Sequence, residues 1–500
     1  MPSTVTTSAP AVPIPLRDVA TACGPRADLS SADAGTTLVT DVTHDSRQVT
    51  AGMLFACRPG QRSDGHDHAP AAVGAGAAAL LVERFLDLPV PQVRVPSVAQ
   101  VMGPAAAAVH NDPSSELLLL GVTGTNGKTT TAYLLESVLA AAGHVTGLVG
   151  TIETRVAGTP IPGVRTTPEA TDLQRLLRRM RDAGVTGAAM EVSSHGLSLG
   201  RVRATRFRAA VFTNLSLEHL DFHADMEDYF AAKRSLFDAA YTPVGIVNTD
   251  DPYGERLASE AAVEVVRVSA RGVPAHARAT AVEADAEGSV FTARLRTGSV
   301  RVRVELPGMF NVANALLAVA AADAVGIQPD AAAAGIAACR GVPGRMERVD
   351  AGQPFTVLVD YAHTPEALAN VLRSVREVSS GRIVVVIGCG GDRDPGKRPL
   401  MGRVAAELSD AAVLTSDNPR SEDPQAILDA MIAGAAEVPG ARWRAELDRR
   451  AAIGLALDTA QPGDVVVVAG KGHEATQELR DRVVPFDDRA IVRELLGAAA

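Results

Sequence analysis

The sequence predicts an α/β protein of three domains: a small N-terminal domain, a central domain with a mostly parallel sheet, and a C-terminal domain with a second parallel sheet. A chain of 500 residues is too long for one hydrophobic core, since a domain usually takes about 100 to 200 residues. Short apolar runs alternate with amphipathic helical patterns, and most runs lead directly into polar or glycine-rich loops. This alternation is typical of parallel sheets, whose ligand loops follow the carboxyl ends of the strands.

Composition and charge exclude several classes of protein. With 46% hydrophobic and 21% charged residues the chain can bury large cores, and a net charge of -10 argues against a nucleic-acid binder. The four cysteines lack metal-ligand spacing, which favours a reducing cytoplasm. Residues 1–15 have neither the charged start nor the apolar core of a signal peptide. We therefore expect a disordered tail at 1–15 and no membrane insertion.

The first two domains are expected at residues 16–111 and 112–343. Polar residues and a proline at Asn111-Asp-Pro-Ser-Ser115 mark the boundary, because an apolar strand at 117–122 begins directly after them. In the central domain the apolar strands 187–190 and 209–212 each lead into a polar loop. A mostly parallel sheet follows from this arrangement.

The third domain is expected at residues 344–500, after a hinge that Gly341-Val-Pro-Gly344 indicates. Four apolar strands each precede a charged or glycine-rich loop, which predicts a Rossmann-like α/β domain with its own ligand edge. These strands are 355–359, 384–387, 411–415 and 465–469.

A phosphate-binding loop is predicted at Gly121-Val-Thr-Gly-Thr-Asn-Gly-Lys-Thr129, between a strand and a helical pattern at 129–142. Glycines let backbone N–H groups approach phosphate oxygens, and the helix N-terminus adds favourable partial charge. Lys128 can neutralise the phosphates and Thr129 can ligate Mg²⁺. The glycine pattern is irregular, since Val122 stands five positions before Gly127.

The run Gly124-Thr-Asn-Gly-Lys-Thr-Thr130 resembles the loop of the Mur ligases and of the folylpolyglutamate synthases. Further runs resemble Mur ligase landmarks in the expected order along most of the chain. They are Thr166-Thr-Pro168, Glu191-Val-Ser-Ser-His195, Asn214 through His219-Leu-Asp221, Gly308-Met-Phe-Asn311 with Asn314, Gly344-Arg-Met-Glu347 and Asp360-Tyr-Ala-His-Thr-Pro365. The resemblance implies an ATP-dependent, amide-forming ligase of peptidoglycan synthesis that releases ADP and phosphate.

By resemblance, ATP binds to residues of the phosphate-binding loop and of the last three landmarks, with Asp360 at the ribose. These residues are Gly124, Thr125, Asn126, Gly127, Lys128, Thr129, Thr130, Asn311, Asn314, Arg345 and Asp360. Without the resemblance, Asn311 could equally be a helix cap and not an ATP-binding residue, since capping is the commoner use of asparagine at the start of a helix.

The resemblance also implies catalytic residues and Mg²⁺ ligands. Lys128, Glu191, His219 and Lys233 are the catalytic set, and Thr129, Glu191, His219 and Lys233 are the metal ligands. In the family, the lysine that corresponds to Lys233 is carbamylated by CO₂ and so becomes an anionic metal ligand. From the residues alone, Lys233 would be a solvated helix lysine and Glu191 an ordinary carboxylate at a strand end.

The motif Asp417-Asn-Pro-Arg420 is associated, within the family, with members that add meso-diaminopimelate. The distal carboxylate of this amino acid suits a guanidinium, and lysine has no such group. The resemblance places Arg393, Asp417, Asn418, Pro419, Arg420, Gly470 and Glu474 in the pocket, with Glu474 at the distal ammonium. Outside the motif, Arg420 would be a surface-loop arginine after a proline.

The second substrate implied is UDP-N-acetylmuramoyl-L-alanyl-D-glutamate. Ser46, Thr166, Thr167, Ser193 and Arg201 are the residues that would bind it. Two positions depart from the family pattern: Arg165 stands where relatives often have Asn, and Leu199 where some have Gln. We expect a monomeric cytoplasmic enzyme.

Three alternatives stay open. A lysine-adding member of the family is disfavoured by Arg420, and a folylpolyglutamate synthase by the N-terminal domain with its Asp45-Ser-Arg47 run. A non-catalytic nucleotide-binding scaffold is disfavoured by the intact catalytic set.

Overall fold

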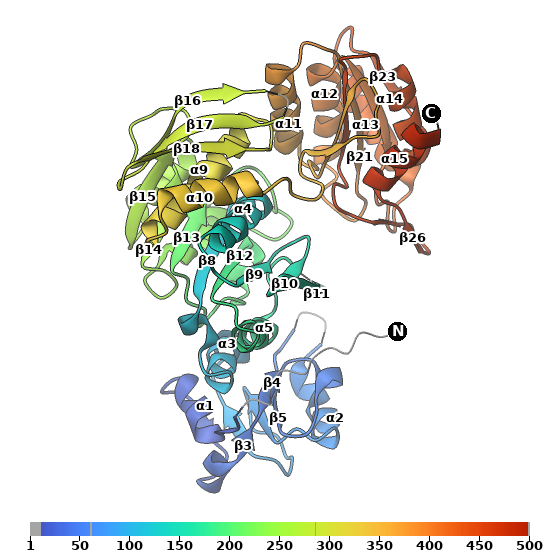
Figure 1. Ribbon diagram of the computed structural model, residues 1–500. Coiled ribbons are helices and arrows are strands. Elements are labelled where there is room, and N and C mark those ends of the chain that lie inside the picture. Colours follow the sequence, from blue (N-terminus) through green and yellow to red (C-terminus); the bar gives the residue numbers. More distant parts are fainter. Residues whose placement is uncertain (1–11, 61–62, 162, 164, 286, 499–500) are drawn as a thin grey trace.

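The computed structural model describes residues 12–60, 63–161, 163, 165–285 and 287–498, arranged around three main sheets that follow one another along the chain (Figure 1). Residues 1–11 of the predicted tail lie outside the described residues. The described cysteines carry free thiols. No helix in the described ranges is long and apolar enough to cross a membrane.

The first sheet has the strand order β2-β7-β6-β5-β4, and β4 to β7 run parallel. Its short apolar strands are buried on both faces: Leu54 packs toward α1 and α3, and Phe55 toward α2. The elements are β1 (Ile14–Pro15), α1 (Leu16–Ala22), β2 (Asp28–Leu29), β3 (Leu38–Val39), β4 (Asp41–Thr43), β5 (Met53–Ala56), α2 (Ala69–Gly74), β6 (Ala79–Val82), β7 (Gln92–Arg94) and α3 (Val98–Val109).

The central sheet has eleven strands in the order β11-β10-β9-β12-β8-β13-β14-β15-β16-β17-β18. Strands β9 to β16 in this order are parallel, and antiparallel strands extend both edges. The strands are β8 (Leu118–Thr123), β9 (Thr146–Val149), β10 (Thr154–Val156), β11 (Thr159–Ile161), β12 (Gly187–Glu191), β13 (Ala209–Phe212), β14 (Val244–Asn248), β15 (Glu264–Ser269), β16 (Ala277–Ala284), β17 (Ser289–Arg294) and β18 (Ser299–Val304).

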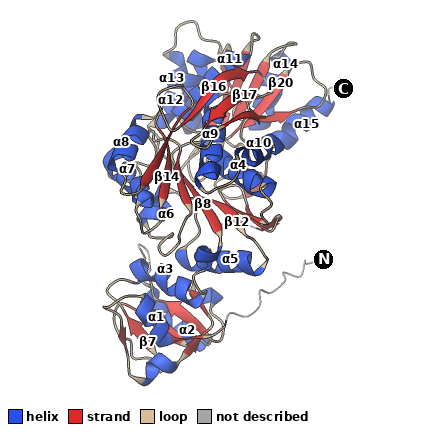
Figure 2. Ribbon diagram, turned by 60° about the vertical axis from the view of Figure 1, so that its left-hand side comes forward, coloured by secondary structure: helices blue, strands red, loops and turns tan. Residues whose placement is uncertain are grey.

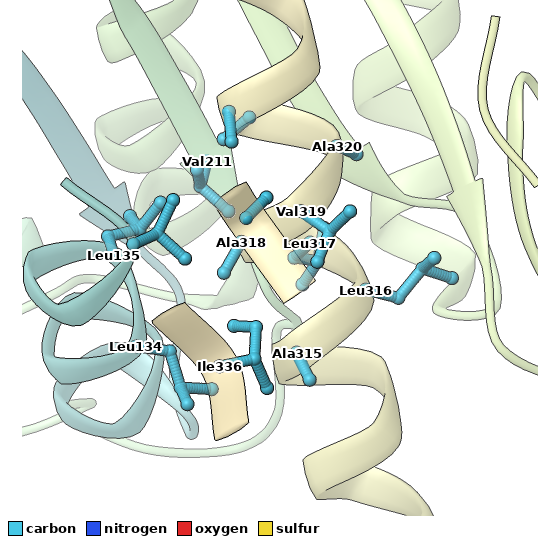
Figure 3. Close-up of a cluster of buried hydrophobic side chains, with 14 of the residues drawn as sticks. Leu134, Leu135, Val211, Ala315, Leu316, Leu317, Ala318, Val319, Ala320 and Ile336 are labelled. Atoms are coloured by element: carbon cyan, nitrogen blue, oxygen red, sulfur yellow. The ribbon is translucent and has the colours of Figure 1, made fainter. Parts of the chain in front are cut away.

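Helices cover both faces of the central sheet. On one face Leu134 and Leu135 of α4 pack around Ala318 of α9 and Ile336 of α10 (Figure 3). On the other face α5 and α7 lie over the sheet, and α5 also meets α3 below it (Figure 2). The helices are α4 (Lys128–Ala141), α5 (Ala170–Asp182), α6 (Ser194–Ser198), α7 (Met226–Arg234), α8 (Pro252–Glu260), α9 (Met309–Ala324) and α10 (Pro329–Ala338).

The third sheet has the order β19-β20-β24-β21-β22-β23, parallel except for the pairing of β19 with β20. Successive valines of β21 enter opposite cores, as a doubly covered sheet requires. The elements are β19 (Glu347–Val349), β20 (Thr356–Asp360), α11 (Pro365–Val378), β21 (Ile383–Cys389), α12 (Lys397–Leu408), β22 (Ala411–Ser416), α13 (Pro424–Ala436), β23 (Trp443–Ala445), α14 (Arg449–Thr459), β24 (Val465–Ala469), β25 (Thr476–Glu478), β26 (Val483–Pro485) and α15 (Asp488–Ala498).

The linker between the second and third sheets packs closely at its last glycine. Gly344 has a φ of +63°, and a Cβ added there would lie 2.0 Å from the backbone N of His473. Its own N–H donates a hydrogen bond to Glu347 Oε2 at 2.8 Å. The predicted hinge therefore lies directly against the loop that follows β24.

The α/β fold class with three sheet-based domains is confirmed, and the predicted strands correspond to β8, β12, β13, β20, β21, β22 and β24. The antiparallel strands β10, β11, β17 and β18 were not foreseen. On β18 buried and exposed residues alternate, so its apolar content is low. It therefore lacks the continuous apolar run that marks the buried strands.

A fully buried ion pair joins α14 to α15. Arg449 Nε lies 2.8 Å from Asp488 Oδ1 and Nη2 lies 2.6 Å from Oδ2, and neither side chain is exposed. We expect Arg449→Met to lower the free energy of unfolding by about 3 to 5 kcal/mol, because Asp488 is left as an unpaired buried charge. Urea unfolding followed by circular dichroism measures the shift. Arg450→Met, which removes an exposed pair with Glu494, is the control and should change little; equal shifts in both variants would contradict this expectation.

Candidate active site

The predicted phosphate-binding loop connects β8 to α4, as expected. Gly124 and Gly127 have φ values of +148° and +86°, and added Cβ atoms would lie 1.8 Å from Thr213 Oγ1 and 2.5 Å from Asn314 Oδ1. Glycine is therefore required at both positions. The backbone N–H of Asn126 donates to Asn214 Oδ1 at 2.9 Å, which holds the loop against the segment after β13.

Two lysines donate hydrogen bonds to the same backbone carbonyl of this loop. Lys128 Nζ donates to Gly124 O at 2.9 Å, and Lys233 Nζ, brought by α7, donates to the same oxygen at 2.8 Å. Lys233 is 1% exposed. Burial, followed by repulsion from Lys128, holds the pKa of Lys233 well below its usual value. The neutral amine, the form that reacts with CO₂, is therefore favoured at Lys233.

Glu191 lies at the carboxyl end of β12, beside the loop, and is completely buried. Its Oε2 accepts hydrogen bonds from the hydroxyls of Thr129 and Thr151, each at 3.0 Å, and Oε1 accepts from the Thr151 N–H at 2.7 Å. A buried carboxylate next to hydroxyl oxygens is the donor set that Mg²⁺ prefers.

Within the described ranges, no three His, Cys, Asp or Glu side chains gather as a metal cage. Mg²⁺ is usually bound through one or two carboxylates, with substrate phosphates and water as the remaining ligands. The residues around Glu191 therefore suit a Mg²⁺ that a bound nucleotide helps to hold.

His219 follows β13 in a left-handed backbone conformation, with a φ of 60°. Its ring contacts those of His195 and Tyr229, with centroids 4.9 and 5.9 Å apart. Burial lowers the pKa of His219 to about 4, and nearby Lys128 adds to this, although Glu218 opposes it. The imidazole is therefore neutral, as a metal ligand must be. Tyr229 also lies under Lys233, 4.5 Å from Nζ to the ring centroid, so His219 and Lys233 flank one aromatic ring.

A cavity of about 540 Å³ lies between the central and third sheets. Seven of the eleven residues predicted to bind ATP line it: Asn126, Gly127, Thr130, Asn311, Asn314, Arg345 and Asp360. Arg345 crosses to the central sheet, where its Nη2 lies 3.3 Å from Thr129 Oγ1. Glu218 and His363 make a second contact between the sheets, 3.3 Å from Oε1 to Nε2. The cavity thus draws on segments from both sheets.

Two of the predicted ATP residues also have structural partners. Asn311 Nδ2 donates to Pro307 O at 2.8 Å, but the N-cap of α9 is Gly308 and no side chain caps this helix, so Asn311 is not a helix cap. Asp360 accepts backbone N–H bonds from Met346 and Ala362, both at 2.7 Å. Asp360 therefore fixes the turn that carries Arg345.

Helix α11 also lines this cavity, which was not predicted from the sequence. Glu366, Asn370 and Arg373 of this helix line it, together with Asn248 at the end of β14. The α11 residues stand three or four positions apart, on one polar helix face. Such a face is usually solvated, so the sequence offered no motif by which to find it.

Residues predicted to bind the sugar nucleotide gather next to Glu191. Thr167 Oγ1 and Ser193 Oγ are 3.1 Å apart, and Thr166 Oγ1 lies 3.0 Å from Thr151 Oγ1. Arg201 is held by buried Glu169, with Nη2 2.9 Å from Oε1. Ser46 has no described hydrogen bond to this group and belongs to the first sheet's 3-10 turn at Ser46–Gln48.

Contacts between the first and central sheets lie beside this group. Arg58, from the loop after β5, places Nη1 2.9 Å from the second oxygen of Glu169, Oε2. His44 Nδ1 lies 2.9 Å from Thr171 Oγ1. Arg165, the departure from the family pattern, also pairs with Glu169. Three guanidinium groups thus surround one carboxylate, which leaves a net positive charge where an anionic substrate would be held.

The residues predicted to bind the amino acid lie at the carboxyl edge of the third sheet. Asn418 Nδ2 donates to Glu474 Oε2 at 2.8 Å, and a Cβ on Gly470 would lie 2.8 Å from Asp417 Oδ2. Arg420 Nη1 donates to Gly391 O at 2.8 Å. Arg393 is exposed and donates to the adjacent Asp392 O. A Cβ on Gly390 would lie 3.1 Å from Arg420 Nη1 and 3.9 Å from Arg393 Cγ, so Arg393 also borders this set.

Lys471 was missed by the sequence analysis. Its side chain is completely buried, and Nζ lies 2.9 Å from Asn418 Oδ1 and 3.1 Å from Glu474 Oε2. The only available signal was its place in Gly470-Lys-Gly-His-Glu474, where it resembled a solvated loop lysine.

Comparisons with known proteins agree along the chain. The model described as "Mur ligase family, catalytic domain" matches residues 38–118, "Mur ligase middle domain" matches 122–322, and "Mur ligase, glutamate ligase domain" matches 344–472. The matches cover the regions of all three sheets.

Curated relatives align over nearly the whole chain. A Streptomyces coelicolor protein named UDP-N-acetylmuramoyl-L-alanyl-D-glutamate--2,6-diaminopimelate ligase is 50% identical, over 97% of this chain and 98% of the relative. A protein of the same name from Geobacillus kaustophilus is 45% identical, over 90% and 93%.

Solved structures agree with the fold. One that carries the same ligase name is 33% identical, with a TM-score of 0.67 over 92% of this chain and 95% of that one. A Mycobacterium tuberculosis folylpolyglutamate synthase, complexed with ADP and AMPPCP, is 20% identical, with a TM-score of 0.63 over 79% and 94%, and shares the fold.

Proposed function

Because the chain belongs to the Mur ligase family, we propose that it joins meso-diaminopimelate to the D-glutamyl carboxylate of UDP-N-acetylmuramoyl-L-alanyl-D-glutamate, with ATP converted to ADP and phosphate. The protein is an ATP-dependent amide ligase of peptidoglycan synthesis. The relatives named for this reaction align over the full set of sheets, which separates the chain from the folylpolyglutamate synthases.

The chemistry requires an activated carboxylate, because oxide is not a workable leaving group. Transfer of the γ-phosphoryl group of ATP to the D-glutamyl carboxylate gives an acyl phosphate. The amine of diaminopimelate then attacks the acyl carbon, and phosphate leaves from the tetrahedral intermediate. Both steps gather negative charge, so orientation and positive charge dominate catalysis. Lys128 supplies such charge at the phosphate loop.

Mg²⁺ is the proposed metal ion, with Thr129 and Glu191 as ligands near the loop and His219 and carbamylated Lys233 at a second position. When bound it offsets the negative charge of the phosphate oxygens. The buried Glu191 carboxylate, the neutral His219 imidazole and the depressed pKa of Lys233 support this assignment.

One observation supports the whole proposal: the cavity in which loops from two sheets meet. Asn126 and Gly127 come from the phosphate loop, and Arg345 and Asp360 come from the third sheet, which also carries the amino-acid pocket. Thr166, Thr167, Ser193 and Arg201 would bind the muramoyl-peptide end of the sugar nucleotide, and Ser46 its uridine diphosphate. We further propose a cytoplasmic monomer, since one chain supplies every residue of the site.

Phosphate release from ATP tests the proposal. It is measured with UDP-N-acetylmuramoyl-L-alanyl-D-glutamate and either meso-diaminopimelate, lysine or no amine. We expect release that depends on diaminopimelate. Faster release with lysine would indicate a lysine-adding enzyme, and no release with any amine would favour a non-catalytic scaffold.

Arg420→Ala is expected to raise the KM for diaminopimelate by about tenfold or more, because a charge-assisted bond to the distal carboxylate is lost. The kcat should change little, since this end of the amino acid does not react. Initial rates at varied diaminopimelate, with both other substrates saturating, give the two constants. Arg450→Ala is the matched control, because Arg450 is an exposed arginine of the same domain that pairs with Glu494 and is not among the pocket residues; unchanged amine kinetics in Arg420→Ala would refute the pocket assignment.

A further inference from the structure

Arg420 is held in a strained position. Its φ of 52° lies in the left-handed region, which costs a non-glycine residue about 1 kcal/mol or more. Its backbone N–H donates to Glu478 O at 3.0 Å, which ties the strained residue to β25. Glu478 therefore helps to fix the backbone from which the guanidinium extends.

The side chain of Glu478 also holds the guanidinium. Arg420 Nε lies 2.7 Å from Glu478 Oε2, while Nη1 donates to Gly391 O at 2.8 Å. A guanidinium has five N–H donors, and these two contacts use one on Nε and one on Nη1. Among the described residues, Nη2 makes no hydrogen bond. The free N–H groups thus lie on the Nη1–Nη2 edge, which can bind a carboxylate through two parallel bonds.

Glu478 is also connected to the other half of the pocket. Its backbone N–H donates to Asn418 Oδ1 at 3.0 Å, and the same oxygen accepts from Lys471 Nζ at 2.9 Å. Lys471 in turn pairs with Glu474. Asn418 Nδ2 and Lys471 Nζ both donate to Glu474 Oε2. The other oxygen, Oε1, has no hydrogen bond among the described residues.

Two charged pairs lie in the pocket. Arg420 is matched by Glu478, and Glu474 by Lys471. One edge of Arg420 and one oxygen of Glu474 are left to bind a ligand. A free guanidinium edge beside a free carboxylate oxygen suits a group with one carboxylate and one ammonium, such as the distal end of diaminopimelate. An amine without the carboxylate would leave the Arg420 edge unpaired.

We propose that Glu478 is a specificity-determining residue of the amino-acid pocket, which orients Arg420 so that its Nη1–Nη2 edge receives the distal carboxylate of diaminopimelate. The inference rests on the proposed function. Glu478 acts through Arg420 and not on the reacting atoms, so it is a positioning residue. Its removal acts on the selection of the amine and not on the chemical step.

The test compares diaminopimelate with lysine in Glu478→Ala and Glu478→Gln. In Glu478→Ala the KM for diaminopimelate should rise about five- to tenfold, with kcat and the constants for lysine unchanged, because only the carboxylate contact is affected. Glu478→Gln keeps an oxygen that accepts from Arg420 Nε and should recover most of the lost selectivity. Asp481→Ala, in the same hairpin and paired only with Arg482 among the described residues, is the control.

Three results would overturn the proposal. The first is unchanged selectivity in Glu478→Ala. The second is a lower KM for diaminopimelate in this variant, which would mean that Glu478 competes with the substrate for Arg420. The third is a parallel change in the KM of all three substrates. Failure of the proposed function is a separate result, since the unmodified protein would then release no phosphate in response to diaminopimelate.

Discussion

Lys128→Ala is expected to lower kcat for phosphate release by about 10³-fold or more, because it removes the positive charge proposed to stabilise the transferred phosphoryl group. Lys128 bonds to two carbonyls of its own loop, Gly124 O at 2.9 Å and Thr125 O at 2.8 Å. In the proposed reaction this ammonium group would stabilise the negative charge of the phosphate oxygens. The loss should therefore fall on kcat as well as on the affinity for ATP.

Steady-state phosphate release at saturating substrates measures this loss, and thermal unfolding provides the control for folding. The loop is also held by Asn214 and by its two glycines, so the variant should keep its melting temperature. A variant that retained a tenth of the kcat would contradict the role assigned to Lys128.

Lys233→Met is the second substitution with a large expected effect, a loss of about 10² to 10³-fold in kcat. The reason is that Lys233 is proposed to carry a carbamate, and neither methionine nor any uncharged side chain supplies the anionic oxygens. Lys233→Arg should be equally inactive, because a guanidinium stays charged and does not take up CO₂. A buried lysine that acted only as a cation would instead tolerate arginine, so this pair of variants separates the two roles.

Isotope-labelled CO₂ gives a direct measurement of the same feature. The neutral amine reacts with CO₂, and the depressed pKa of Lys233 gives this residue a larger share of that form than an exposed lysine has. One carbamate signal in the NMR spectrum of the unmodified protein, absent from Lys233→Arg, is the expected result. Full activity of Lys233→Arg without the signal would refute the carbamate.

The positions of the buried strands could be predicted from the sequence, but the full extent of the central sheet could not. Buried parallel strands such as β13 and β24 are continuous apolar runs, which are visible in a single sequence. The edges of the central sheet are different, because β18 exposes every second side chain and β10 and β11 have three residues each. Short or half-exposed strands lack a distinctive pattern, so the size of this sheet could not be predicted.

The site was predictable where a motif fixes the backbone. The phosphate loop and Glu191 lie side by side because the loop follows β8 and Glu191 is the last residue of the neighbouring parallel strand, β12. Three residues could not be found from the sequence. Arg58 and Glu478 depend on contacts with residues far away in the chain, and Lys471 depends on the complete burial of its side chain. Their chemistry arises only when the tertiary fold brings partners together. The roles of the individual site residues stay predictions until the substitutions above are measured.

The packing of Gly344 has a consequence for how the third domain can move. The glycine leaves no space between the linker and the Gly472–His473 backbone, where an added methyl group would overlap His473 N. That backbone belongs to the same short loop as Lys471 and Glu474. The linker therefore packs directly against the loop that forms part of the amine pocket. Rotation of the third domain about Gly344 must displace this loop. The angle between the domains and the shape of the amine pocket therefore change together, and a substitution at Gly344 should disturb amine selection although it lies outside the pocket.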